Sequence, residues 1–348
     1  MAKQWYHLQK IVPCAYGGVD IKSTLQEFTG HTGQVESVAF SPDGNYILTG
    51  SDDSTSRLWD KNGRLKAVYK DHIGGVNAVA FSPDGKSILS GSDDSTFHLI
   101  NLDGSIIRSF SRQPEGIYTL AFSPDGKYIV TGGGDGTGRL WDIMGNELAV
   151  LRGHHGGISA VVFSPDGQTI LTGSYDSTVC LWNLHGQKIK MIGPLNNMIS
   201  SAVFSPDGKT ILTGSYDSAA RMWDRNGNLL QEFSDNSNNI TAVAFSPDGK
   251  TILTGSSNHV LFWSPLGYKI RDFSNINGEI NSMVFSPDAT DQSNSSKASK
   301  VYKTILIGSS DNKARLISEL TPLLLTFLNS GKIEKLSEAQ RIKYTDIK

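Results

Sequence analysis

The pentapeptide Phe-Ser-Pro-Asp-Gly at residues 40–44 recurs along this 348-residue chain at a nearly constant interval. Further copies begin at Phe81, Phe122, Phe163, Phe204 and Phe245, and a seventh, Phe-Ser-Pro-Asp-Ala, begins at Phe285. Successive copies begin 41 residues apart, except that the last two begin 40 apart. Self-similarity at about 40–45 residues is typical of a structure built from repeated four-stranded units.

Each repeat can be read as four strands separated by turns. In the first repeat, residues 35–40 form an alternating segment, and Ser-Pro-Asp-Gly supplies a turn in which Pro presets φ and Gly accepts a left-handed conformation. Residues 46–50, 56–60 and 65–69 read as the second to fourth strands, with Asn62-Gly63 as another hairpin turn. Seven such units predict an all-β fold, a seven-bladed β-propeller of four-stranded antiparallel blades.

Two recurring residue pairs relate the chain to a known family. Trp-Asp pairs stand at Trp59-Asp60, Trp141-Asp142 and Trp223-Asp224, and Gly-His pairs stand at Gly30-His31 and Gly153-His154. On these residues the chain resembles the WD-repeat family over residues 24–318, and the uniformity of its blades is similar to that of bacterial WD-repeat arrays. The resemblance implies a non-enzymatic scaffold that binds protein or peptide partners on the loop face of the propeller.

The resemblance also implies a structural hydrogen-bond relay inside the blades. Its members would be His31, Thr49, Asp53 and Trp59 in the first blade, and His154, Thr172, Asp176 and Trp182 in the fourth. These residue types also make up a hydrolase triad, but a catalytic set would occur once rather than as a decaying series. The histidine position holds Leu195, Asn236 and Ile276 in blades 5 to 7, so we expect packing to be the chief stabilising interaction there.

Composition excludes several classes of protein. A formal net charge of -2 argues against a nucleic-acid partner, because phosphate binding requires a basic excess. No segment approaches the roughly 20 apolar residues that cross a bilayer, so no membrane association is expected. The two cysteines, Cys14 and Cys180, cannot form a disulfide framework, which fits a cytoplasmic location. The spacing of the histidines and aspartates indicates no metal site, no cofactor is expected, and Cys180 is expected to be an inert core thiol.

The ends of the chain bear on ring closure. We expect a lead segment at residues 1–23, a propeller at 24–318 with Thr24–Phe28 as its closing strand, and a helical tail at 319–348. The segment Leu323–Phe327 is in register for the same outer position, so it is the alternative closing strand. Thr321-Pro322 and Gly331 favour a helix instead, and a closed ring without free edges is expected to be a monomer.

Irregular positions indicate where a partner would bind. The residue before the turn aspartate is tyrosine in two adjacent blades, Tyr175 and Tyr216, and exposed tyrosines are frequent binding anchors. The predicted partner surface adds His155, Asn196, Met198, Asp52 and Asp93. The polar insertion at residues 289–302 is the alternative location. Two other functions are weaker alternatives: a ligand-sensing module of a bacterial NTPase switch system, and a hydrolase that uses the central channel.

Overall fold

The computed structural model describes residues 24–110, 113–234, 238–274, 276–287 and 304–318. Its contacts divide the chain into one unit of residues 26–319 and another of residues 1–25 and 320–348, of which only Thr24 and Leu25 are described. The lead segment, the inserted loop and the tail with its alternative closing strand lie outside the described residues. Within the described ranges, no helix has the length and apolar character needed to cross a membrane.

The strands form seven four-stranded antiparallel sheets, so the predicted seven-bladed propeller is confirmed. The first three blades contain, in order, β2 (Val35–Phe40), β3 (Tyr46–Ser51), β4 (Ser56–Asp60), β5 (Leu65–Tyr69); β6 (Val76–Phe81), β7 (Ser87–Ser92), β8 (Phe97–Asn101), β9 (Ile106–Phe110); β10 (Ile117–Phe122), β11 (Tyr128–Gly133), β12 (Gly138–Asp142) and β13 (Glu147–Leu151).

The remaining four blades follow the same plan. They contain β14 (Ile158–Phe163), β15 (Thr169–Ser174), β16 (Val179–Asn183), β17 (Lys188–Ile192); β18 (Ile199–Phe204), β19 (Thr210–Ser215), β20 (Ala220–Asp224), β21 (Leu229–Phe233); β22 (Ala242–Phe245), β23 (Ile252–Ser256), β24 (His259–Trp263), β25 (Lys269–Phe273); and β26 (Ile280–Phe285), β27 (Thr304–Ser309), β28 (Lys313–Ser318) with β1 (Thr24–Phe28).

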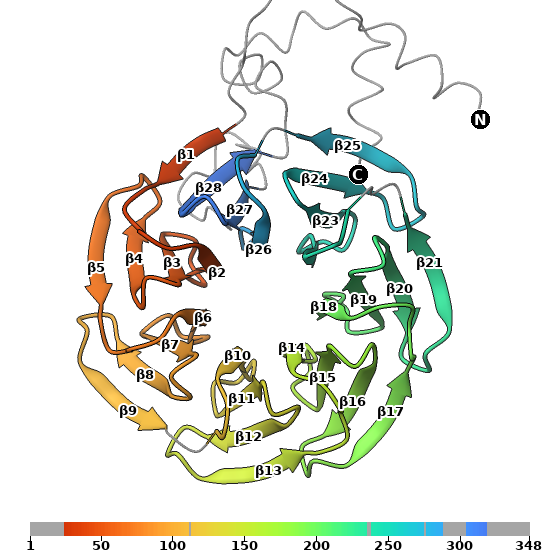
Figure 1. Ribbon diagram of the computed structural model, residues 1–348, viewed down its shortest axis with the longest axis horizontal. Helices are drawn as coiled ribbons and strands as arrows, with labels where there is room; N and C mark the ends of the chain where they lie inside the picture. Colours follow the sequence, from red (N-terminus) through yellow and green to blue (C-terminus); the bar gives the residue numbers. More distant parts are fainter. Residues whose placement is uncertain (1–23, 111–112, 235–237, 275, 288–303, 319–348) are drawn as a thin grey trace, which may run out of the picture. The chain divides into compact units, whose positions relative to one another are not determined.

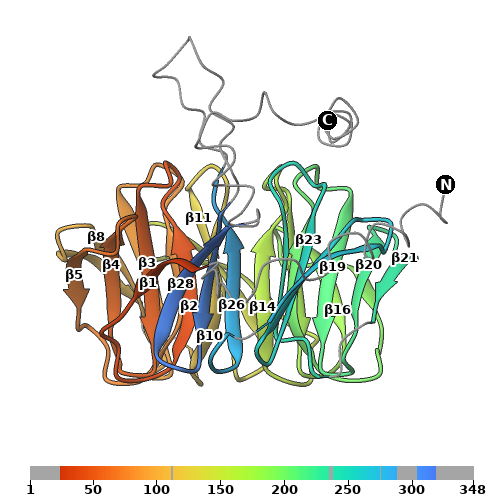
Figure 2. The ribbon, with the colours of Figure 1, turned by 90° about the horizontal axis from the view of Figure 1, so that it is seen from above.

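The blades surround a central channel. Figure 1 shows the first strands of the blades, such as β2 and β6, nearest the centre and the fourth strands, such as β5 and β9, at the rim. Figure 2 shows the same blades edge-on, with their turns gathered on two opposite faces of the ring. The hairpins between second and third strands lie on one face, which we call the loop face.

The recurring pentapeptide forms the turn between the first two strands on the opposite face. Ser41 Oγ accepts the Tyr46 N–H at 2.9 Å, and Gly44 adopts φ +67°, a left-handed conformation that favours glycine. Pro42 also lies against the next turn, because a Cβ on Gly85 would lie 3.4 Å from its Cδ. The pentapeptide therefore both forms the turn and contacts the turn of the neighbouring blade.

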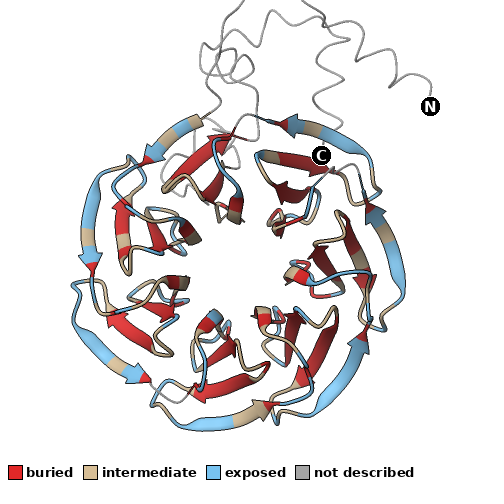
Figure 3. Cartoon of the chain, viewed as in Figure 1, coloured by how far each residue is buried: buried red, intermediate tan, exposed pale blue. Residues whose placement is uncertain are grey.

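The hydrophobic core lies between blades rather than within them. Leu48, Leu58 and Tyr69 of blade 1 pack in one cluster with Val76 and other residues of blade 2. Figure 3 shows the second and third strands as largely buried and the outermost strands as largely exposed. Each blade therefore depends on its neighbour to cover its apolar face.

Ring closure joins the two ends of the described chain. Strand β1 lies beside β28 as the outermost strand of blade 7. Phe28 is 1% exposed and packs in a cluster with Trp59 of blade 1 and Leu316 of blade 7. Glu27 accepts from Arg315 Nε at 3.1 Å, so β1 supplies both apolar and ionic contacts at the seam.

We predict that deletion of residues 1–28 prevents stable folding, because it exposes the edge of β28 and removes Phe28 from the shared core. Size-exclusion chromatography and thermal melting of the purified variant test this. Deletion of residues 332–348 is the control and should leave the melting curve unchanged. A monomeric 1–28 deletion that melts like the full chain would mean that another segment, such as Leu323–Phe327, fills the outer position.

Candidate functional site

Blades 1 and 4 each contain a buried chain of hydrogen bonds that links four residues of the same blade. His31 Nδ1 lies 2.8 Å from Asp53 Oδ2, His31 Nε2 lies 2.7 Å from Thr49 Oγ1, and Trp59 Nε1 donates to Thr49 Oγ1 at 3.0 Å. The corresponding distances in blade 4 are 3.0, 2.7 and 2.8 Å, and the residues are His154, Asp176, Thr172 and Trp182. The residues named from the sequence as relay members are thus hydrogen-bonded to one another.

The relay connects the loop-face segments of a blade and is unsuited to hydrolysis. Asp53 also accepts the backbone N–H of Thr32 at 3.0 Å, which ties the segment before β2 to the turn between β3 and β4. Thr49 is fully buried, so no substrate can reach its hydroxyl. Because a nucleophile must reach its substrate, this Asp–His–Thr arrangement does not form a hydrolase site.

Burial favours the neutral form of His31 and His154. It lowers the pKa of His31 and of His154, against the opposing effect of Asp53 and Asp176. Burial also opposes ionisation of Asp53, but hydrogen bonds from Thr55, the Thr32 N–H and His31 outweigh it and lower the pKa of Asp53. A neutral imidazole that donates through Nδ1 accepts the threonine hydroxyl at Nε2, which fits the observed distances.

Where the histidine is missing, an arginine pairs with the turn aspartate. Asp217 accepts from Arg221 Nη1 at 2.8 Å, and Asp311 accepts from Arg315 Nη1 at 3.0 Å and from Arg315 Nη2. The expectation that packing is the chief stabilising interaction in blades 5 and 7 stays a prediction, and the structure adds an ionic contact that the sequence analysis did not foresee. Their turn aspartate keeps a cationic partner from the following strand.

Blades 3 and 6 vary the relay again. Gln113 occupies the histidine position of blade 3, and its amide donates to Thr131 while its oxygen accepts from Arg139 Nη1 at 3.2 Å. Gln113 was overlooked in the sequence, although it stands 41 residues after His72. In blade 6, Trp263 donates to Thr254 at 2.9 Å, and Asn236 lies outside the described residues.

Blade 4 replaces the arginine of the third strand with Cys180. This thiol is fully buried, and burial raises its pKa to about 11, which disfavours the reactive thiolate. Lys188 of β17 supplies the cation instead, with Nζ 5.4 Å from the Trp182 ring centroid. A Cβ on Gly153 would lie 2.5 Å from Lys188 Nζ, just as one on Gly30 would lie 2.5 Å from Arg57 Nη1.

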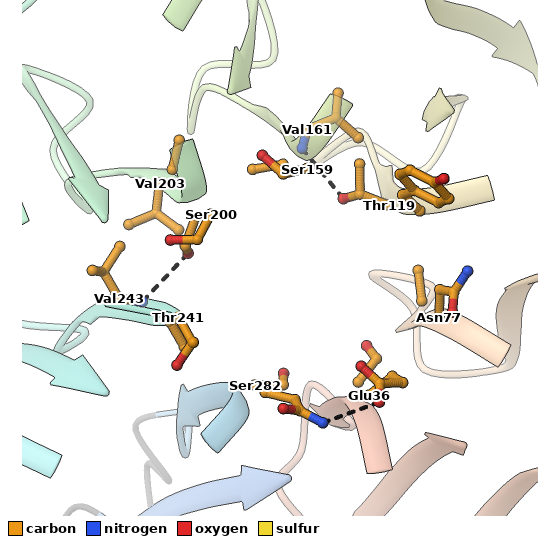
Figure 4. Close-up of a pocket in the computed structure, with 18 of the residues that line it drawn as sticks. Glu36, Asn77, Thr119, Ser159, Val161, Ser200, Val203, Thr241, Val243 and Ser282 are labelled. Carbon is orange, nitrogen blue, oxygen red and sulfur yellow. Dashed lines mark hydrogen bonds between the residues drawn. The ribbon is translucent and has the colours of Figure 1, made fainter. Parts of the chain in front are cut away.

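The loop face opens into a cavity of about 590 Å³ in the central channel. We call its acidic and tyrosine lining the channel mouth: Glu36, Asp93, Tyr118, Tyr175, Tyr216 and Glu279. Figure 4 shows Glu36, Asn77 and Thr241 on different blades around this opening. Tyr118 and Tyr175 are 36% and 37% exposed, and their ring centroids lie 6.4 Å apart. Tyrosine rings and carboxylates therefore face one shared space.

The structure brings together part of the predicted partner surface. Tyr175, Tyr216 and Asp93 lie in the channel mouth. Asp52 lies beside it, because a Cβ on Gly75 would be 3.1 Å from Asp52 Oδ1 and 3.5 Å from Asp93 Oδ2. The remaining predicted residues are exposed but do not line the cavity: His155, Asn196 and Met198.

Glu36, Tyr118 and Glu279 belong to the mouth but were missed in the sequence. Glu36 and Tyr118 occupy the second position of a first strand. At the equivalent positions, five residues donate to a backbone oxygen of the next blade: Asn77, Ser159, Ser200, Thr241 and Asn281. An alignment of the repeats at this position would have identified Glu36 and Tyr118 as the exceptions.

The mouth concentrates negative charge. Burial, reinforced by Asp52, Asp93 and Glu279, raises the pKa of Glu36 to about 7. Asn281 Nδ2 donates to Glu36 Oε1 at 3.1 Å. Among the described residues that line the cavity, none is lysine, arginine or histidine. The carboxylates of the mouth therefore have no cationic side chain beside them in the described lining of the cavity.

Comparisons with known proteins agree with this architecture. A family model described as the IFT122 first beta-propeller matches residues 19–259 and 102–334. A stretch of 42 residues, 12% of this chain and 5% of the relative, is 38% identical to WD repeat-containing protein 36 of Homo sapiens. The crystal structure of the WD40 beta propeller domain of Doa1 superposes with a TM-score of 0.73 at 21% identity, over 86% of this chain and 97% of that chain. At that identity the structural likeness shows the fold alone.

We predict that Asp176→Ala and Asp311→Ala each lower the free energy of unfolding by about 1–3 kcal/mol, because each leaves a buried hydrogen-bonding partner unsatisfied. The loss at Asp311 should match that at Asp176, because its partner Arg315 is only 4% exposed. Denaturant unfolding measures both, with the exposed turn variant Asp103→Ala as control. A midpoint unchanged in Asp311→Ala would contradict the role assigned to Arg315.

We predict that Glu36→Gln stabilises the protein increasingly as pH rises from 4.5 to about 7. The pKa of Glu36 is raised from 4.5 to about 7 in the folded state, so its ionisation opposes folding above pH 4.5, and this cost is absent below the unfolded pKa because the carboxyl is then protonated in both states. Screening at the open mouth reduces the gain to about 1 kcal/mol. Melting temperatures of the variant and the parent, measured between pH 4.5 and about 7, test this prediction, with Glu115→Gln as control. A difference that does not grow with pH would contradict the assignment.

Proposed function

Because the chain belongs to the WD-repeat family of β-propellers, we propose that it is a non-enzymatic scaffold that binds a protein or peptide partner at the channel mouth. The observation that carries the proposal is the combination of Tyr118, Tyr175 and Tyr216 with uncompensated carboxylates around one cavity. Tyrosine supplies a large contact area at low entropic cost, and such residues dominate binding energy in protein interfaces.

The charge of the mouth supports a cationic partner side chain. Asp93 and Glu279 face the cavity, and burial, reinforced by these neighbouring carboxylates, raises the pKa of Glu36 to about 7. A lysine or arginine that enters the cavity would relieve this repulsion and stack against a tyrosine ring. A nucleic acid would instead bring phosphates toward carboxylates, which is unfavourable. The proposed partner is therefore a basic segment of a protein.

The rigid ring supports the same function. Second-position residues such as Ser200 and Thr241 hold adjacent first strands together beneath the mouth. The binding residues therefore sit on elements whose positions are set before the partner arrives, which reduces the entropic cost of binding. The free, buried Cys180 is compatible with the reducing cytoplasm that we propose as its location.

We predict that the purified chain binds fluorescent peptide pools rich in lysine and arginine in preference to acidic or uncharged pools. Fluorescence anisotropy measures the affinity, which should fall with added salt. Tyr175→Ala with Tyr216→Ala should weaken binding by at least about tenfold with little change in melting temperature, since each tyrosine anchor contributes on the order of 1 kcal/mol or more.

Tyr268→Ala is the matched control, because Tyr268 is 70% exposed but lies in the turn between β24 and β25 on the opposite face. This variant should bind as the parent does. Preference for an acidic pool would contradict the proposed partner chemistry. Full binding by the folded double variant would move the site elsewhere, to the insertion at residues 289–302 as the first alternative.

A further inference from the structure

Blade 2 departs from the other blades at several positions that surround one histidine. The position of Gly30 in blade 1 is Asp71 in blade 2, and the position of Arg57 is His98, each 41 residues later. The position of Trp59 is Ile100, so the indole donor is missing. All three changes lie around His72, the relay histidine of this blade.

These changes bring together three groups that can bind a metal. Asp71, His72 and His98 each offer one ligand atom, and the three atoms lie within 4.8 Å of one another. The two imidazole rings have centroids 4.5 Å apart, and each histidine is only 7% exposed. Asp71 is half-buried, so the cluster remains accessible from its side.

The cluster is rich in acceptors and poor in donors. Ser90 Oγ lies 3.0 Å from His72 Nε2 and 3.4 Å from Asp71 Oδ2, so one hydroxyl proton faces two acceptors. In blade 1, the equivalent Thr49 oxygen receives the Trp59 N–H at 3.0 Å, whereas Ile100 offers no donor to Ser90. A cation would satisfy the carboxylate and the imidazole nitrogen together.

We propose that Asp71, His72 and His98 form a zinc-binding site in blade 2. Two imidazole nitrogens and one carboxylate oxygen are a ligand set that zinc accepts, whereas calcium and magnesium require oxygen ligands throughout. Zinc bonds of about 2.0–2.1 Å place neighbouring ligand atoms roughly 3.3 Å apart in a tetrahedral site. Side-chain rotations that bring the ligand atoms closer by up to about 1.5 Å therefore close the cluster, with a fourth position left for water.

The groups behind the ligands suit this role. His72 Nδ1 lies 2.9 Å from Asp94 Oδ2, and His98 Nδ1 lies 2.9 Å from Ser109 Oγ. These contacts hold the ring orientations through Nδ1, an arrangement common in histidine metal sites. The metal would bind at Nε2 of each ring, where it would replace the contacts with Ser90 Oγ at 3.0 Å and with Thr96 Oγ1 at 3.4 Å.

The experiment uses the purified full chain, stripped with a chelator and titrated with Zn²⁺ or with Co²⁺ as a spectroscopic probe. We expect one ion per chain to bind, with a tetrahedral Co²⁺ absorption spectrum that Zn²⁺ abolishes, and a higher melting temperature with zinc. Absence of stoichiometric uptake by the parent chain would overturn the proposal without reference to any variant.

Two variants restore residues that other blades carry, so both are expected to fold. His98→Arg and Asp71→Gly should each weaken zinc binding by at least about tenfold and remove the Co²⁺ spectrum. His155→Arg, at an exposed histidine of blade 4, is the control and should bind as the parent does. Equal binding by the parent and both blade 2 variants would overturn the site, as would loss of binding in the control alone.

Discussion

The close contact of each first strand with the preceding blade underlies the whole ring. A Cβ on Gly50 of β3 would lie 2.9 Å from Cγ1 of both Val76 and Val79 in β6, which is closer than side chains tolerate. The glycines of the other second strands meet the following blade in the same way, as Gly91 does with Ile117 and Leu120. Each fully buried aliphatic side chain contributes about 1.5–3 kcal/mol. Every core cluster contains residues of two neighbouring blades, so no blade is complete alone. The ring must therefore close.

Closure places demands on polar groups as well as on apolar ones. First-strand hydroxyls and amides bond across to the next blade, as Ser200 does to the Ile240 carbonyl at 2.6 Å. In every described blade that has the loop-face turn aspartate, a histidine or an arginine side chain is hydrogen-bonded to its carboxylate. This repeated satisfaction of buried groups stabilises the turns, and it gives the Asp–His–Thr arrangement a structural role in the described blades.

Both proposed sites lie at positions where a blade lacks the hydrogen-bonding residue that the other blades carry. Glu36 and Tyr118 take positions at which other blades place a donor to the neighbouring carbonyl, and both side chains face the channel mouth. Blade 2 lacks the tryptophan donor and gathers Asp71 and His98 around its relay histidine. The two proposed sites differ in chemistry, yet each consists of departures from an otherwise uniform repeat.

The sequence by itself determined the fold, because the interval of the Phe-Ser-Pro-Asp-Gly turns and the four-strand pattern are local properties of the chain. It also identified the relay residues and placed Tyr175 and Tyr216 on the loop face, since positions in one repeat predict positions in the next. Only the tertiary structure decided which side chains meet. Glu36 and Tyr216 come from blades 1 and 5 and share a cavity solely because the ring curves back on itself. Likewise, the arginine partners of Asp217 and Asp311 depend on how a long side chain folds back over its turn, and the approach of His98 to His72 depends on strand pairing in blade 2. Such contacts depend on distance in space, which spacing along the chain does not specify.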